Sequence, residues 1–316
     1  MNPGYFRSRP SATPLWGAAL LTLVVLLVAG CTRHEDASAA PEKLFVTVPE
    51  RRQLVIYEGD AAGSAAPLQV ITEDAPDQPV DVAVDFVGEA FVANANGNIR
   101  VYAPHEGTQY KIFKNYEGSN TRIQHPTAIA VNKAGSFFVA DAGNGVGRLE
   151  WVSGGANGNL VPDRVIEGAD TGIRDPRGVA LDGSGRVFVA DRTANQVLVF
   201  AADANGDATP IARLEGLHAP GHLAVDDVMN VYVANEADNT IAVFGSSGPE
   251  SWTLSATITS KALSQPTGVT TDAAGEIATG AIGGVLFFAG NARGNADPIR
   301  IMTASDPLHP AGICIH

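Results

Sequence analysis

The chain has 316 residues, of which 17% are charged and 45% are hydrophobic, and its formal net charge at pH 7 is −13. Together with 34 glycines and 19 prolines, this composition indicates a globular, turn-rich protein and argues against a disordered one. An acidic chain that lacks any run of Lys or Arg repels phosphate backbones, so nucleic acid is not an expected partner.

Residues 1–30 have the pattern of a secretory signal. Two arginines precede an apolar run over residues 15–28, and small residues follow it. Counted to Gly30, the apolar stretch is 16 residues long, which is shorter than the ~20 residues that a membrane-spanning helix requires. We therefore predict a cleaved signal peptide over 1–30 rather than a transmembrane helix.

Cys31 stands directly after this signal, in the stretch LVAGC (27–31). This stretch resembles the lipobox of bacterial lipoproteins, which implies that Cys31 becomes lipidated. Thr32 follows it in place of Asp, and by resemblance to bacterial sorting signals this favours the outer membrane. Residues 31–42 are polar and Ala-rich, as in a flexible tether. We expect a lipid-anchored protein of the bacterial cell envelope that faces the periplasm or the cell surface.

From residue 43 onward the sequence repeats a short motif that begins with proline. Successive copies start 47, 50, 44, 46 and 44 residues apart. The copies are PVDVAVD (79–85), PTAIAVN (126–132), PRGVALD (176–182), PGHLAVD (220–226), PTGVTTD (266–272) and PAGICIH (310–316). Each full repeat continues with an Asx–Gly turn and further apolar segments, such as FVAD (188–191) and QVLVF (196–200). Four short strands in a period of about 45 residues are typical of a β-propeller blade.

The two ends of this region each supply an incomplete repeat. Segments 44–48, 53–57 and 68–72 match the second, third and fourth strands, and 310–316 matches the missing first strand. We predict that both ends build one blade, since this closes the ring and removes open sheet edges. The expected fold over 43–316 is all-β: a six-bladed propeller with four-stranded blades.

The stretch PRGVALDGSGRVFVADRTANQVLVF (176–200) is similar to the NHL repeat, and ANGDATPIARLEG (204–216) is similar to the outer hairpin of its bacterial members. The resemblance extends over 43–316 and is weakest at EIATGAIGG (276–284), where the second strand is hard to predict. It implies a propeller of the NHL and SMP-30 group. That group includes protein-binding and RNA-binding modules, calcium-dependent lactonases and a zinc-dependent amidating lyase, so the fold alone leaves the function open.

The third position of the proline motif is expected to ring the mouth of the axial channel, where propellers bind ligands. The six residues at this position are Asp81, Ala128, Gly178, His222, Gly268 and Gly312. Asp81 and His222 belong to opposite blades, so we predict that they face each other without a direct hydrogen bond and hold a ligand or water between them. Arg177 at the same rim is a candidate for binding an anion. The alternative is that Asp81 and His222 are solvated rim residues or bond local backbone, and that Arg177 is a solvated cap.

His125, His222 and His309 lie near first-strand starts on alternate blades. Three imidazoles that converge on an axis could bind zinc and leave a position open for water. Their places relative to proline differ by about three residues, or roughly 10 Å along a strand, which argues against one metal sphere. The ends of the second strands could offer oxygen ligands to calcium, but their repetition in four blades favours a structural role. These residues are Asn94, Asp141, Asp191 and Asn235.

Two functions therefore remain open. We expect a binding module without catalytic residues or a cofactor, which holds an envelope protein or glycan at its channel mouth or rim loops. The alternative is a lactonase-like hydrolase or an amidating lyase, with a bound calcium or zinc ion at the channel mouth.

Overall fold

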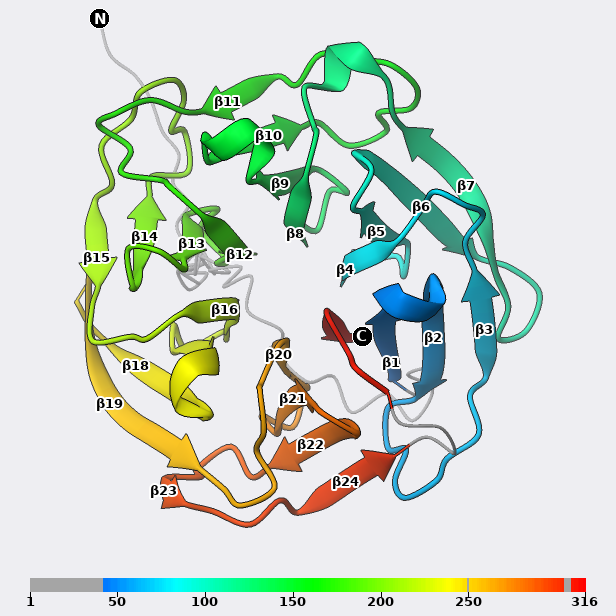
Figure 1. Cartoon of the computed structure of the whole chain (residues 1–316), viewed down its shortest axis with the longest axis vertical. Helices are drawn as coiled ribbons and strands as arrows, with labels where there is room; N and C mark the ends of the chain where they lie inside the picture. Colours follow the sequence, from blue (N-terminus) through cyan, green and yellow to red (C-terminus); the bar gives the residue numbers. More distant parts are fainter. Residues whose placement is uncertain (1–41, 249, 304–307) are drawn as a thin grey trace, which may run out of the picture. The chain divides into compact units, whose positions relative to one another are not determined.

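The computed structural model describes residues 42–248, 250–303 and 308–316, all of which belong to one compact unit. The predicted signal peptide, Cys31 and the tether up to residue 41 lie outside the described residues. The described chain forms six β-sheets, which follow one another around a common axis (Figure 1).

Each sheet is one blade with four antiparallel strands, to which blade 5 adds a short fifth, and the strands are named below in order from the innermost to the outermost. Blade 1 contains β25 (Ile313–Ile315), β1 (Lys43–Val48), β2 (Gln53–Glu58) and β3 (Gln69–Thr72). Blade 2 contains β4 (Pro79–Val84), β5 (Ala90–Asn94), β6 (Asn98–Pro104) and β7 (Tyr110–Tyr116). Blade 3 contains β8 (Pro126–Val131), β9 (Phe137–Asp141), β10 (Arg148–Val152) and β11 (Arg164–Ile166).

The remaining three blades repeat this order. Blade 4 contains β12 (Pro176–Leu181), β13 (Val187–Asp191), β14 (Gln196–Phe200) and β15 (Ala212–Leu214). Blade 5 contains β16 (Pro220–Val225), β17 (Val231–Asn235), β18 (Thr240–Gly248) and β19 (Ser251–Thr259), and the short β23 (Gly294–Asn295) adds to it in parallel. Blade 6 contains β20 (Val269–Thr271), β21 (Ile277–Ala281), β22 (Gly284–Phe288) and β24 (Arg300–Thr303).

The innermost strands contact one another in the cyclic order β4, β8, β12, β16, β20 and β25, and β25 also contacts β4. The predicted all-β, six-bladed propeller with four-stranded blades is thus confirmed. The only helices among the described residues are four short 3₁₀ turns, namely η1 (Pro49–Arg51), η2 (Ser119–Thr121), η3 (Gly143–Gly145) and η4 (Glu236–Asp238). None of the helices within the described ranges has the length and apolar character needed to cross a membrane.

The C-terminal strand β25 pairs with β1 from the N-terminal part of the unit (Figure 1). Cys314 lies opposite Phe45 in this antiparallel ladder. At its end, the N–H of Lys43 donates to the carbonyl of His316 at 2.6 Å, and the return bond measures 3.0 Å. The last residues of the chain therefore provide the innermost strand of a sheet whose other strands come from residues 43–72.

Second strands form the centre of the core. Every residue of β5, β9, β13, β17 and β21 is buried. This continuous burial arises because both faces of each sheet pack against neighbouring blades, so the inside–outside alternation of a half-exposed strand is lost. Strand β21 falls in the stretch where the repeat pattern is weakest, yet it is a regular strand like the other four.

An Asx side chain shapes each turn between the first and second strands. In blade 2, Oδ1 of Asp85 accepts the N–H groups of Val87 at 3.1 Å and Glu89 at 2.8 Å. Asn132, Asp182 and Asp226 make the same pair of bonds in blades 3 to 5. The two residues that follow the Asx are exposed in all five turns of blades 2 to 6.

A glycine in the long outer loops joins neighbouring blades. Four such glycines, each with φ between 58° and 81°, stand four residues before a proline and contact the outermost strand of the preceding blade. The contacts are Gly63 with Met302, Gly158 with Asn115, Gly206 with Ile166, and Gly294 with Ile258. A positive φ is accessible to glycine without steric cost, which explains this residue at all four places.

Candidate functional site

A cavity of about 440 Å³ opens at the end of the channel where the first strands begin. All six blades line it, through Ala311, Val80, His125, Arg177, His222 and Thr267 in blades 1 to 6. The cavity therefore lies on the axis of the ring, at the mouth predicted from the sequence.

Asp81 of β4 and His222 of β16 are in direct contact at this mouth. Nδ1 of His222 lies 3.2 Å from Oδ1 of Asp81, and the two side chains are 18% and 7% exposed. The prediction that they face each other is confirmed, whereas the prediction that they make no direct hydrogen bond is wrong. The two side chains meet because the channel between these opposite blades is narrower than expected.

Glycines at the third motif position make the channel narrow. A Cβ atom on Gly312 would lie 2.1 Å from Oδ1 of Asp81, and one on Gly178 would lie 2.8 Å from the Cα of His222. Adjacent innermost strands thus approach to within contact distance of their backbones, which only glycine allows. Because the innermost strands lie so close together, the side chains of one aspartate and one histidine are long enough to contact each other across the channel.

Asp81 also binds the neighbouring blade. Its second oxygen, Oδ2, accepts the N–H of Ile129 in β8 at 2.9 Å. With one oxygen fixed by β8, the carboxylate presents the other to Nδ1 of His222, which orients the imidazole ring. A proton on Nδ1 that is donated to Asp81 leaves Nε2 as the ring nitrogen available to another molecule.

The pKa of His222 is raised above its ordinary value. Burial acts to lower this pKa, but the Asp81 carboxylate, through its charge and its hydrogen bond, raises it by more. Glu236 adds to the rise, and the positive charge of Arg177 opposes it. The imidazolium form of His222 is therefore stabilised mainly by its contact with Asp81.

Two arginines stand at the cavity, each paired with a carboxylate. Nε of Arg177 lies 2.9 Å from Oδ1 of Asp175, and Arg192 forms a close ion pair with Glu236. Their side chains are 44% and 39% exposed, so the guanidinium groups remain accessible to a ligand. Arg177 was predicted at this rim, whereas Arg192 and Glu236 were not.

The repeat pattern contains a feature from which Arg192 and Glu236 could have been predicted. Arg192 and Glu236 directly follow the last residues of β13 and β17, whereas Ala95 and Ala142 hold the corresponding places in blades 2 and 3. All four residues line the cavity. Two charged residues at a position occupied by alanine in other blades therefore mark one side of the mouth.

The three histidines considered for zinc do not come together. His125 and His222 line the cavity, but His309 is exposed and is not part of its lining. Within the described residues, no group of three His, Cys, Asp or Glu side chains could hold a metal ion. The zinc arrangement therefore fails because His309 precedes its strand outside the cavity.

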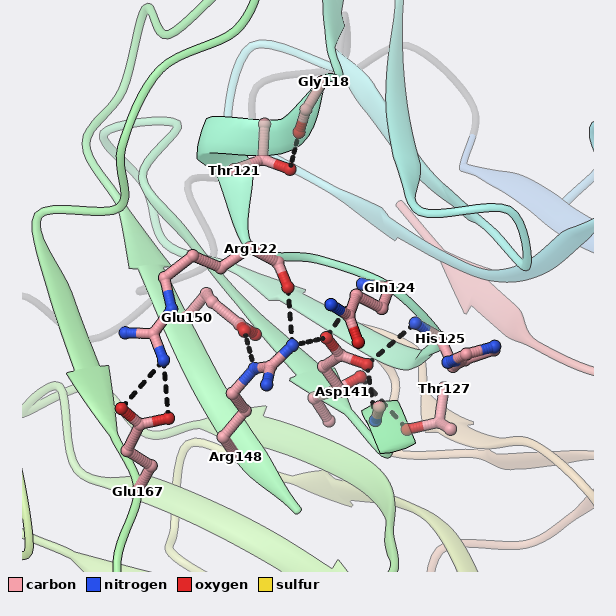
Figure 2. Close-up of polar contacts among 12 residues, drawn as sticks. Gly118, Thr121, Arg122, Gln124, His125, Thr127, Asp141, Arg148, Glu150 and Glu167 are labelled. Carbon is pink, nitrogen blue, oxygen red and sulfur yellow. Dashed lines mark hydrogen bonds and ion pairs between the residues drawn. The ribbon is translucent and has the colours of Figure 1, made fainter. Parts of the chain in front are cut away.

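Of the four residues that end the second strands, Asp141, Asp191 and Asn235 bind backbone, whereas Asn94 donates to the side chain of Asn98. Asp141 accepts N–H groups from Gln124 at 2.9 Å, His125 at 2.8 Å and Gly143 at 2.8 Å (Figure 2). Asp191 and Asn235 accept N–H groups from the corresponding segments of blades 4 and 5. These residues fix the segments that precede the first strands, including the one that carries His125.

A buried ionic cluster lies behind Asp141. Nη2 of Arg148 lies 2.8 Å from Oδ2 of Asp141, and its Nε lies 2.5 Å from Oε1 of Glu150 (Figure 2). Burial, with a contribution from Asp141, raises the pKa of Glu150 to about 8, although Arg148 acts to lower it. Arg148 thus joins Glu150 to the carboxylate that binds the segment before β8.

A model of the family described as lactonase, 7-bladed beta-propeller matches residues 56–306. The chain belongs to this lactonase family. Its structure has six blades where the family description names seven. The NHL-repeat assignment is a finer prediction that this match leaves open.

Three solved structures illustrate the likeness of fold. A protein of unknown function from Bacteroides caccae is 12% identical over 87% of this chain and 99% of its own, with a TM-score of 0.65. A putative 6-phosphogluconolactonase from Bacteroides uniformis is 12% identical over 84% of both chains, with a TM-score of 0.59. The periplasmic gluconolactonase PpgL of Pseudomonas aeruginosa is 15% identical over 87% of this chain and 99% of its own, with a TM-score of 0.56. No curated protein matches the chain.

Proposed function

We propose that this protein hydrolyses a lactone in the cavity at its channel mouth. The observation that carries the proposal is the direct contact of Asp81 with His222, whose side chain lines the cavity together with Arg177 and Arg192. Membership of the lactonase family supports the second of the two functions considered from the sequence, and the comparisons give the binding scaffold no support.

Opening a lactone requires a base that takes a proton from water, donors that stabilise the oxyanion, and an acid that protonates the leaving oxygen. In the proposed reaction, Nε2 of His222 accepts the proton of the attacking water while Nδ1 donates to Asp81. Asp81 stabilises the imidazolium that forms. The same proton then passes to the ring oxygen as the C–O bond breaks, so one water is consumed and a hydroxy acid is released.

Arg177 and Arg192 would hold the negative charge that develops. A guanidinium group binds a carboxylate or an oxyanion through parallel N–H donors. Asp175 and Glu236 pair with the arginines in the structure and keep them at the rim. The product, a carboxylate, fits these two cations better than the neutral ester does, and the oxyanion of the intermediate has the same preference.

A small, polar lactone suits the site. The cavity of about 440 Å³ lies within the range of ~300–1,000 Å³ that is usual for small-molecule sites. The charged side chains of Arg177, Arg192 and Glu236 in its lining, together with the sugar-acid lactonases among the structural neighbours, support the lactone of a sugar acid as the substrate class. The proposed reaction uses side chains alone, and no three potential metal ligands come together within the described segments.

The test follows proton release as the full-length protein opens glucono-δ-lactone and its 6-phosphate, measured above the spontaneous rate. His222→Gln removes the base and should lower kcat/KM by about 100-fold or more. His218→Gln is the matched control, because His218 also pairs with an aspartate, at 2.7 Å, but is exposed and lies outside the cavity lining. Equal activity in His222→Gln and the parent, or no activity on either lactone, would overturn the proposal.

A further inference from the structure

We infer that the propeller rests on a lipid bilayer through the face opposite the candidate site, with Phe86, Val87 and Val228 in contact with the lipid. This surface, the tip face, is formed by the exposed residue pairs in the five turns between first and second strands. The pairs are 86–87, 133–134, 183–184, 227–228 and 273–274.

Three large apolar side chains project from the tip face. Phe86 is 71% exposed, Val87 67% and Val228 73%. The fold does not require them, because the Asp85 and Asp226 side chains already fix these turns through backbone N–H groups. Exposed apolar area of this kind costs free energy in water and marks a surface that contacts another apolar body.

These side chains lie on one face because the innermost strands run in the same direction. Equivalent motif positions touch between neighbouring blades: Asp81 binds Ile129 of β8, and Gly178 lies against His222. All five turns consequently leave the ring at the same end. Phe86 and Val228 belong to opposite blades, 2 and 5, so a flat surface would contact both sides of the ring.

The charge of the tips suits a neutral membrane surface. Although the chain has a formal net charge of −13, the ten tip residues include only Lys133 and Asp227 as charged side chains. The carboxylates of Asp85 and Asp226 are engaged with the backbone of their own turns. A bilayer with zwitterionic headgroups therefore fits this face better than an anionic one.

The N-terminal end of the described chain enters the propeller at this face. Lys43 begins β1 beside His316, at the end of the innermost strand β25. Eleven residues separate Lys43 from Cys31, and an extended segment of that length reaches at most ~40 Å. A lipid on Cys31 would keep the tip face near the bilayer and leave the cavity open to solvent on the other side. The inference rests on this predicted lipidation and is independent of the lactonase proposal.

The experiment uses the full-length protein, isolated with its native N-terminal modification and reconstituted into phosphatidylcholine vesicles with brominated acyl chains. Phe86→Trp and Val228→Trp place a fluorophore on either side of the tip face. Val146→Trp is the matched control, because Val146 is 55% exposed and follows β9, at the mouth end of blade 3. Once the predicted signal peptide with Trp16 is cleaved, Trp151 and Trp252 remain and give the same background in all three variants.

We expect the bromines to quench the emission of Phe86→Trp and Val228→Trp at least twofold more than that of Val146→Trp, with a blue shift of the first two on vesicles. Equal quenching in the three variants, or none, would overturn the inference. Protection of position 86 that appears without lipid and grows with protein concentration would show that a second copy covers the face, and this would also overturn it.

Discussion

Nδ1 of His222 and Oδ1 of Asp81 lie 3.2 Å apart, although the residues come from opposite blades of the ring. Side chains of opposite blades meet at the axis because glycines elsewhere at the same motif position let the innermost strands converge. The contact couples the protonation of the two groups, and this coupling can be measured.

Asp81→Asn should lower the pKa of His222, because it removes the charge that raises it. Since the folded pKa of His222 is raised, the stability that the pair contributes is full below the ordinary histidine pKa and is lost as pH rises through the folded value. The unfolding free energy of the parent minus that of Asp81→Asn should therefore depend on pH. This difference should be about 1 kcal/mol larger at pH 5 than at pH 9.

NMR titration of the His222 ring protons and urea unfolding at both pH values measure the two effects. If the variant kept the parent's His222 pKa, the assignment of Asp81 as its main electrostatic partner would be wrong. In the proposed reaction only neutral His222 acts as a base, so kcat/KM should also rise with pH through the raised pKa.

Glu150→Gln should flatten the dependence of stability on pH. Burial raises the folded pKa of Glu150 to about 8, so the folded protein holds this proton more tightly than the unfolded chain. Stability from this group is present below the ordinary carboxyl pKa and falls as pH rises toward 8. Between pH 5 and pH 8.5, the unfolding free energy of the variant should fall by about 1–3 kcal/mol less than that of the parent. Thermal unfolding of both proteins across this pH range measures the difference. The same dependence of stability on pH in the two proteins would contradict the prediction.

Gly312→Ala should destabilise the protein by about 2 kcal/mol or more, since the new Cβ would lie 2.1 Å from Oδ1 of Asp81. Gly183→Ala is the matched control: its Cβ would meet no atom within 4 Å, and its φ is not in the left-handed region. The control should change stability by no more than ~0.5 kcal/mol. Urea midpoints compare the two, and equal midpoints would show that the innermost strands can move apart.

Deleting residues 310–316 should abolish cooperative folding. The deletion removes β25 and leaves the ladder edge of β1 unpaired beside β4 and β20. Cys314→Ala keeps the strand and places a residue that four other blades have at this position, so it should fold normally. Near-ultraviolet circular dichroism distinguishes the two, and a native spectrum for the shortened chain would refute the prediction.

The repeat made most of the fold predictable, because each recurring residue meets a backbone requirement that local sequence reveals. Asp85 and its equivalents shape a turn, and the small third-position residues let strands converge. The sequence motif could not show how closely the innermost strands approach one another. Counting blades placed Asp81 and His222 opposite each other, but the width of the channel depends on tertiary packing around Gly178 and Gly312.

The candidate site was predictable only in part. Asp81, His222, Arg177 and His125 were identified because they occupy or flank the proline motif, and Asp81 with His222 forms the central contact. Arg192 and Glu236 lie beyond the second strands, where loop conformation decides whether a side chain reaches the cavity. His309 is as close to its motif as His125 is, yet it is exposed outside the cavity.

The glycine contacts of the outer loops divide the six junctions between blades into two kinds. Backbone bonds of Gly63, Gly158, Gly206 and Gly294 join four junctions. At the other two junctions, side chains make the contacts. Gln69 bonds both backbone groups of Tyr110 between blades 1 and 2, and Trp252 packs edge-on against Phe188 between blades 4 and 5.

These two junctions lie opposite each other and separate blades 2–4 from blades 5, 6 and 1. Asp81 belongs to the first half and His222 to the second. The Asp81–His222 bond therefore joins the two halves across the axis, where no outer-loop glycine contact does so.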